Sequence, residues 1–95
     1  MADIKQYSRQ SLEKRVTGRL GHLYMNFFNL SHKFPEAERQ LDLITEVLAS
    51  RSMDETVQIY HYMQRCLNSS VALEDYSRAI VFRDMMAHYY RHILG

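Results

Sequence analysis

The chain has 95 residues, 46% of them apolar, and a formal net charge of +1 at pH 7. This is enough for one small domain that needs no disulfide or metal, and the single cysteine excludes an internal disulfide. No run approaches the roughly 18 consecutive apolar residues of a membrane span, and the first residues lack the apolar segment of a signal peptide. We therefore expect a soluble, cytoplasmic protein with no membrane partner. We also expect a homo-oligomer, because a domain this small buries more surface when it self-associates.

Helix is the secondary structure that the patterning predicts, because glycine and proline are scarce and apolar residues recur at steps of three or four. Residues 1–10 show no sustained periodicity and are expected to form a loose arm. A first helix is predicted over residues 11–33 from one apolar face, made of Leu12, Val16, Leu20, Leu23, Phe27 and Leu30. Gly21 lies within this helix at a cost of about 1 kcal/mol relative to Ala, which indicates a close crossing with another helix.

A second helix is predicted over residues 35–50. Pro35 suits its first position, where a missing N–H costs nothing. Glu36 and Glu38 then place negative charge in the first turn, where the helix dipole favours it.

A third helix is predicted over residues 53–72. Ser52 and Glu55 have the spacing of a capping box, in which the hydroxyl and the carboxylate each accept a hydrogen bond from a free backbone N–H. The end of this helix stays open between two alternatives. The turn falls either at residues 68–70, which are polar, or at residues 74–75, where Asp75 can cap a following helix.

The last predicted helix covers residues 76–94. Its apolar residues form a heptad-like seam of Tyr76, Ala79, Phe82, Met86, Tyr89 and Ile93. Such a seam suits a hairpin in which this helix lies antiparallel to the third. We therefore predict one all-α domain over residues 1–95, a small four-helix domain with a C-terminal antiparallel helical hairpin over residues 53–94.

Residues 60–90 resemble the UVR motif, a helical hairpin at the ends of nucleotide-excision-repair subunits and in some adaptors of bacterial protease chaperones. The resemblance rests on an acidic-aromatic turn, a small residue in the next helix and an apolar-Arg-Asp-x-apolar run, here Glu74-Asp75-Tyr76, Ala79, and Phe82, Arg83, Asp84 and Met86. In that family the hairpin pairs with another hairpin or docks on a partner and has no catalytic role. The chain departs from the family in its polar residues 68–70, and residues 1–50 have no counterpart.

The leading functional hypothesis is a small protein-interaction module or adaptor, which self-associates or docks on a protein partner through the C-terminal hairpin. Tyr and Met are enriched at protein interfaces, and the chain has seven and six of them. Arg78, Arg83 and Asp84 are expected to set register by pairing across helices. The predicted interface consists of Tyr76, Arg78, Phe82, Arg83, Asp84, Met86, Tyr89 and Tyr90.

Two alternatives belong to other classes. Residues 1–33 are rich in cations, so a nucleic-acid-associated accessory protein could bind phosphates through Lys5, Arg9, Lys14, Arg15 and Arg19. We favour a simpler interpretation, in which these cations are neutralised by the acidic stretch 34–58. A viral or mobile-element accessory protein that inhibits a host complex is the other alternative, and no residue pattern supports it directly.

Catalysis and cofactor binding have little support. Asp84, His88 and His92 share a helical face and are the only metal-ligand pattern, but the Glu of a zinc-protease helix is missing. Cys66 has apolar neighbours, which favours a core residue over a nucleophile. We expect neither an enzyme nor a bound cofactor, and histidines that are exposed or at an interface.

Overall fold

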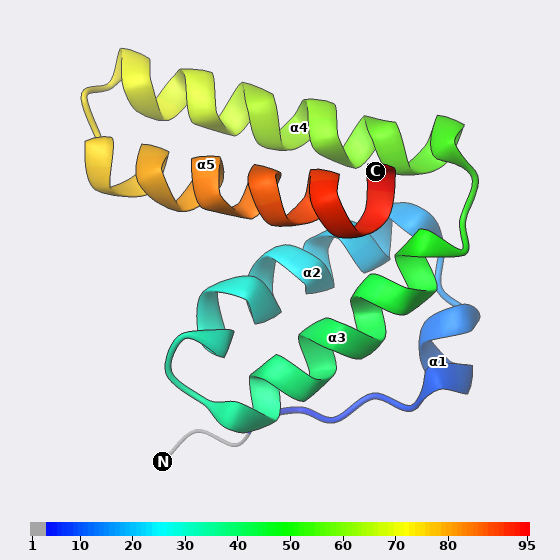
Figure 1. Ribbon diagram of the computed structural model, residues 1–95. Helices are drawn as coiled ribbons and strands as arrows, with labels where there is room; N and C mark the ends of the chain where they lie inside the picture. Colours follow the sequence, from blue (N-terminus) through cyan, green and yellow to red (C-terminus); the bar gives the residue numbers. More distant parts are fainter. Residues whose placement is uncertain (1–3) are drawn as a thin grey trace.

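The computed structural model describes residues 4–95, and this part of the chain is all-α, which confirms the predicted fold class (Figure 1). The elements are α1 (Arg9–Glu13), α2 (Thr17–Ser31), α3 (Pro35–Ala49), α4 (Met53–Ala72), α5 (Tyr76–Tyr89) and a π-helical turn, Tyr90–Leu94. Helices α4 and α5 lie side by side, run in opposite directions and form a layer over α2 and α3 (Figure 1). No helix in the described range is long and apolar enough to cross a membrane.

The core lies between these two layers. Every α-helix contributes to it, and the largest fully buried apolar side chains are Leu12, Leu20, Tyr24, Ile44, Leu48, Met63, Met85 and Tyr89. Burial of each large apolar side chain stabilises the fold by roughly 1.5–3 kcal/mol. One continuous core therefore replaces the disulfides or metals on which smaller domains depend.

The second and third predicted helices are confirmed almost to the residue. Helix α3 begins at Pro35. At the start of α4 the Ser52 hydroxyl accepts a hydrogen bond from the Glu55 N–H at 3.3 Å. The prediction that the Glu55 carboxylate completes the capping box is wrong. This carboxylate instead accepts a hydrogen bond from the Thr17 hydroxyl at 3.1 Å. The box residue thus ties α4 to α2.

The prediction of a single first helix over residues 11–33 is wrong. The chain forms two helices, and Val16 between them has an extended backbone and occupies the N-cap position of α2 without a side-chain hydrogen bond. Helix α1 also begins earlier than predicted, because the Ser8 hydroxyl accepts a hydrogen bond from the Ser11 N–H at 3.1 Å. Val16, which the apolar spacing placed in the core, is 69% exposed. Residues 4–95 therefore form five α-helices where four helices were expected.

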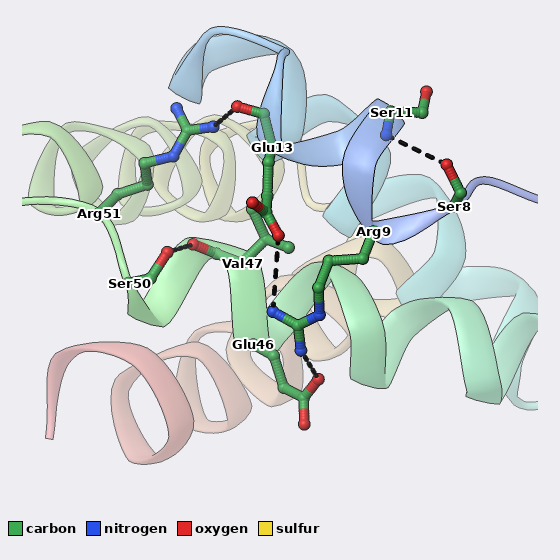
Figure 2. A network of polar contacts seen from close by, with 8 residues as sticks. All are labelled: Ser8, Arg9, Ser11, Glu13, Glu46, Val47, Ser50 and Arg51. Carbon is green, nitrogen blue, oxygen red and sulfur yellow. Dashed lines mark hydrogen bonds and ion pairs between the residues drawn. The ribbon is translucent and has the colours of Figure 1, made fainter.

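Arg51, between α3 and α4, accounts for the break. Its guanidinium donates hydrogen bonds to the backbone carbonyls of Glu13 at 2.9 Å and Arg15 at 2.8 Å, and to the Thr17 hydroxyl at 3.1 Å. Figure 2 shows Arg51 reaching the Glu13 carbonyl at the end of α1. A helix that ends early leaves carbonyls without intrahelical partners. Charge-assisted hydrogen bonds from Arg51 satisfy them, so the break is stable.

The segment before α1 packs on the domain, in contrast to the loose arm expected over residues 1–10, of which 1–3 lie outside the described residues. Tyr7 donates its backbone N–H to the Gln40 side chain at 2.8 Å and accepts a hydrogen bond from that side chain at 3.3 Å. The Tyr7 ring meets Phe27 edge to face, with centroids 6.2 Å apart. Ile4 and Tyr7 both contact the core.

Gly21 marks a close crossing of α2 and α4, as predicted. A Cβ at this position would lie 2.9 Å from two carbons of the Ile59 side chain. Gly18, one turn earlier in the same helix, has no atom within 4 Å of such a Cβ. The two glycines therefore form a matched pair that separates helix propensity from packing.

Gly18→Ala should raise the free energy of unfolding by up to about 1 kcal/mol, because alanine favours the helix. Gly21→Ala gains the same propensity but overpacks the crossing, at a cost of about 1–3 kcal/mol, so its net effect should be destabilising. Urea denaturation of both variants measures the difference. Equal stabilisation by the two substitutions would show that Ile59 moves aside freely.

Arg51→Met should lower the free energy of unfolding by about 2 kcal/mol, because it leaves the carbonyls at the helix break without their donors. Amide hydrogen exchange at residues 14–17 should accelerate in the same variant. Arg39→Met, on the exposed side of α3, is the matched control. Equal destabilisation by the two substitutions would argue against a special role for Arg51.

Candidate protein-interaction surface

Exposed apolar side chains are concentrated where α4 turns into α5. Nine large apolar residues of the described chain are exposed, and five of them lie within residues 71–81: Val71, Leu73, Tyr76, Ile80 and Val81. We call residues 71–81 the hairpin tip. Leu73 is 80% exposed and Tyr76 is 59% exposed, so neither side chain is buried in the core. A local concentration of exposed apolar residues is typical of an interaction surface.

The backbone of the hairpin tip decides between the two turn positions left open by the sequence. Helix α4 runs through residues 68–70 without a break and ends at Ala72. Glu74 then takes a left-handed conformation with φ of 59°, and the Asp75 N–H donates a 2.8 Å hydrogen bond to the Ser70 carbonyl. The Asp75 carboxylate caps α5 by accepting a hydrogen bond from the Arg78 N–H at 3.2 Å. This helix-ending motif gives the exposed residues a defined arrangement.

The predicted interface residues divide between the surface and the core. Exposed members are Tyr76, Arg78, Arg83, Asp84 and Tyr90. Phe82 is half-buried against the core, whereas Met86 and Tyr89 are buried within it. The seam therefore serves mainly to hold α5 on the domain, and its two buried members are not accessible to a partner.

The prediction that Arg83 and Asp84 pair across helices is wrong, because they pair with each other within α5. Their side chains face each other at 3.4 Å, and both are exposed. A surface pair of this kind contributes little to stability. Arg78 instead lies over the Phe82 ring, with its guanidinium carbon 5.6 Å from the ring centroid.

Tyr24 and Tyr89 are structural residues whose role the sequence did not reveal. Both are fully buried, and their rings meet edge to face at 5.3 Å between centroids. The Tyr89 hydroxyl donates a hydrogen bond to the Thr56 carbonyl at 2.5 Å. Burial raises the pKa of both phenols well above the usual value, so both stay protonated. In the sequence, Tyr24 and Tyr89 have the same helical spacing as the other apolar residues, so nothing distinguished them.

His88 connects α5 to α2. Its Nδ1 shares a 2.5 Å hydrogen bond with the Tyr24 hydroxyl, and its ring lies 4.4 Å from that of His92 between centroids. Burial lowers the pKa of His88, the charges of His92 and Arg91 lower it further, and the Asp42 carboxylate opposes them. The folded state therefore favours the neutral imidazole, which can accept a hydrogen bond.

The predicted metal-ligand pattern does not form a site. Asp84 pairs with Arg83, while His88 is engaged by Tyr24. In residues 4–95 no group of three or more His, Cys, Asp or Glu side chains has the geometry to hold a metal ion. Helical spacing brought the rings of His88 and His92 together, whereas the Asp84 carboxylate contacts Arg83.

Three of the five basic residues of the nucleic-acid alternative contact other side chains of this domain. Arg9 pairs with Glu46 at 2.5 Å and with Glu13 at 3.9 Å (Figure 2). Lys5 and Arg15 lie over the Tyr7 ring at 5.3 and 5.0 Å from its centroid.

Four of the five, Lys5, Arg9, Lys14 and Arg19, are exposed, and the helix break separates Lys14 from Arg19. The single basic helix face on which the nucleic-acid alternative depended is therefore absent from the described structure.

Comparison with known proteins finds no relative of this chain. No protein-family model, curated protein or solved structure matches the chain. The resemblance of residues 60–90 to the UVR motif therefore stays a prediction.

The lowered pKa of His88 should make the stability of the domain depend on pH. The unfolded state binds its proton near the ordinary pKa of about 6.5, whereas the folded state resists it. The stability that His88 contributes is present above this pH and is lost as pH falls through the lower folded-state pKa. Thermal unfolding of wild type and His88→Gln between neutral and mildly acidic pH should give a shallower loss for the variant. Parallel curves would contradict the role of His88.

Proposed function

We propose that this protein is a small protein-interaction module that docks on a protein partner, or on a second copy, through the hairpin tip. The observation that carries the proposal is the concentration of exposed apolar residues at residues 71–81. Each large apolar side chain that a partner covers contributes favourably to binding, since water is removed from its surface. The function is binding, and no catalytic residue or cofactor is assigned. A reducing, cytoplasmic setting suits the free thiol of Cys66.

The defined backbone of the tip supports the same proposal. The Asp75 cap and the hydrogen bond from Asp75 to Ser70 hold the exposed side chains in one arrangement. Binding of a partner therefore costs little conformational entropy at the hairpin tip. Of the predicted interface residues, Tyr76 and Arg78 lie in the hairpin tip, together with Leu73 and Ile80, which were not in the predicted set.

Nucleic-acid binding is the weaker candidate. Arg9 is paired with the Glu46 carboxylate, and the helix break separates Lys14 from Arg19. Phosphate binding requires cations that are free to replace counterions along a backbone. The viral or mobile-element alternative has no observation that favours it over a general interaction module.

Photo-crosslinking in cells tests the proposed docking surface. A photoreactive amino acid in place of Ile80 should form adducts with a discrete protein or with a second copy, and the same group in place of Arg39 should not. Leu73→Ser combined with Tyr76→Ser should abolish the adducts, because losing an interface anchor typically costs about 2 kcal/mol of binding. Circular dichroism should show an unchanged fold, since both residues are exposed. Identical adducts from positions 80 and 39, or none from either, would refute the docking surface.

A further inference from the structure

An open groove runs between the end of α4 and the start of α5, beside the hairpin tip. It has a volume of about 380 Å³, which is within the range of ligand-binding pockets. Its apolar lining is formed by Tyr62, Cys66 and Leu73, at positions that share one face of α4. Tyr62 and Leu73 are both exposed, so the apolar floor is open to a ligand.

Two arginines flank this floor without a partner of their own. Arg65 holds its guanidinium over the Tyr62 ring, with its central carbon 5.8 Å from the centroid, and Arg78 is held in the same way over Phe82. Within residues 4–95 neither guanidinium forms an ion pair or donates a side-chain hydrogen bond. Contact with an aromatic ring positions a guanidinium and leaves its N–H groups free for a carboxylate.

The one carboxylate in the lining is already engaged. Asp75 accepts the capping hydrogen bond from the backbone N–H of Arg78. The groove therefore combines an apolar floor with two unneutralised cations at its edges. A matching ligand needs the reverse, an apolar side chain to cover the floor and carboxylates beside it.

We propose that this groove binds a peptide segment in which acidic residues flank a large apolar side chain. The apolar side chain lies over Tyr62, Cys66 and Leu73, and the carboxylates accept hydrogen bonds from Arg65 and Arg78. The inference rests on the proposed interaction function and names the chemistry of the partner.

The groove suits a peptide better than a nucleic acid. A phosphate backbone carries a charge every few ångströms and binds along a track of cations. Of the residues that line this groove, two are cationic, Arg65 and Arg78, which suits a few carboxylates better than a long phosphate backbone. A second hollow of about 210 Å³, lined by Gly18, Gly21 and Met25, adjoins it at Tyr62, so a peptide can extend across α4 onto α2.

A phage-displayed library of random peptides, selected on the full chain, tests this proposal. Enriched peptides should combine Asp or Glu with a large apolar residue. Arg65→Gln combined with Arg78→Gln should weaken their binding by about ten-fold or more, because charge-assisted hydrogen bonds are lost. Arg39→Gln, away from the groove, should leave binding unchanged. Thermal melts show that each variant is folded.

Cys66 provides a second readout in the unaltered protein, because it is the single cysteine and lines the groove. A bound peptide should slow its reaction with iodoacetamide. The proposal is overturned if no peptides are enriched, if enriched peptides lack acidic residues, or if binding neither depends on the two arginines nor protects Cys66. Protection of Cys66 by an oligonucleotide or by self-association alone would also overturn it. Photo-crosslinks from position 80 would in each case still support the proposed function.

Discussion

The burial of Tyr89 is the interaction on which the arrangement of this domain depends. Its ring lies against Tyr24 of α2 and stacks on Tyr60 of α4, and its hydroxyl donates to the Thr56 carbonyl. One side chain thereby joins the end of α5 to both layers. A buried phenol needs a partner for its hydroxyl, so the Thr56 carbonyl sets its orientation as well as its burial.

This anchoring has a direct consequence for the other end of the hairpin. The core holds the C-terminal half of α5 through Met85, Met86 and Tyr89, whereas Ala79 is the only buried residue among residues 71–81. The turn between α4 and α5 therefore lies away from the buried end of the hairpin (Figure 1). Apolar side chains there are free to meet a partner. The same geometry leaves the groove beside the turn open on one side.

Polar contacts determine how the N-terminal part joins this framework. Arg51 donates hydrogen bonds to the carbonyls of Glu13, at the end of α1, and of Arg15, within the break, and Gln40 binds the backbone of Tyr7. In the basic segment, Arg9 pairs with Glu46 and Arg15 lies over the Tyr7 ring. The ion pair makes Arg9 less available to phosphates.

Local chemistry was readable from the sequence wherever it acts within a few residues. Pro35 and the Ser52 hydroxyl begin α3 and α4 at the expected residues, and Asp75 caps α5 at one of the two expected positions. Gly21 signalled a close crossing because a glycine inside a helix is costly without such a reason.

Tertiary contacts decided the rest. Leu12, Val16 and Leu20 fit a single helical stripe, yet donors from Arg51, distant in sequence, stabilise a break that leaves Val16 exposed. Helix α5 carries apolar residues on several faces, so spacing could not show that Tyr89 points inward while Tyr76 and Ile80 point outward. The sequence by itself determined the fold class and most helix ends, since caps and periodicity are local. Only the tertiary structure decided which apolar face is buried, because that depends on which other helix covers it.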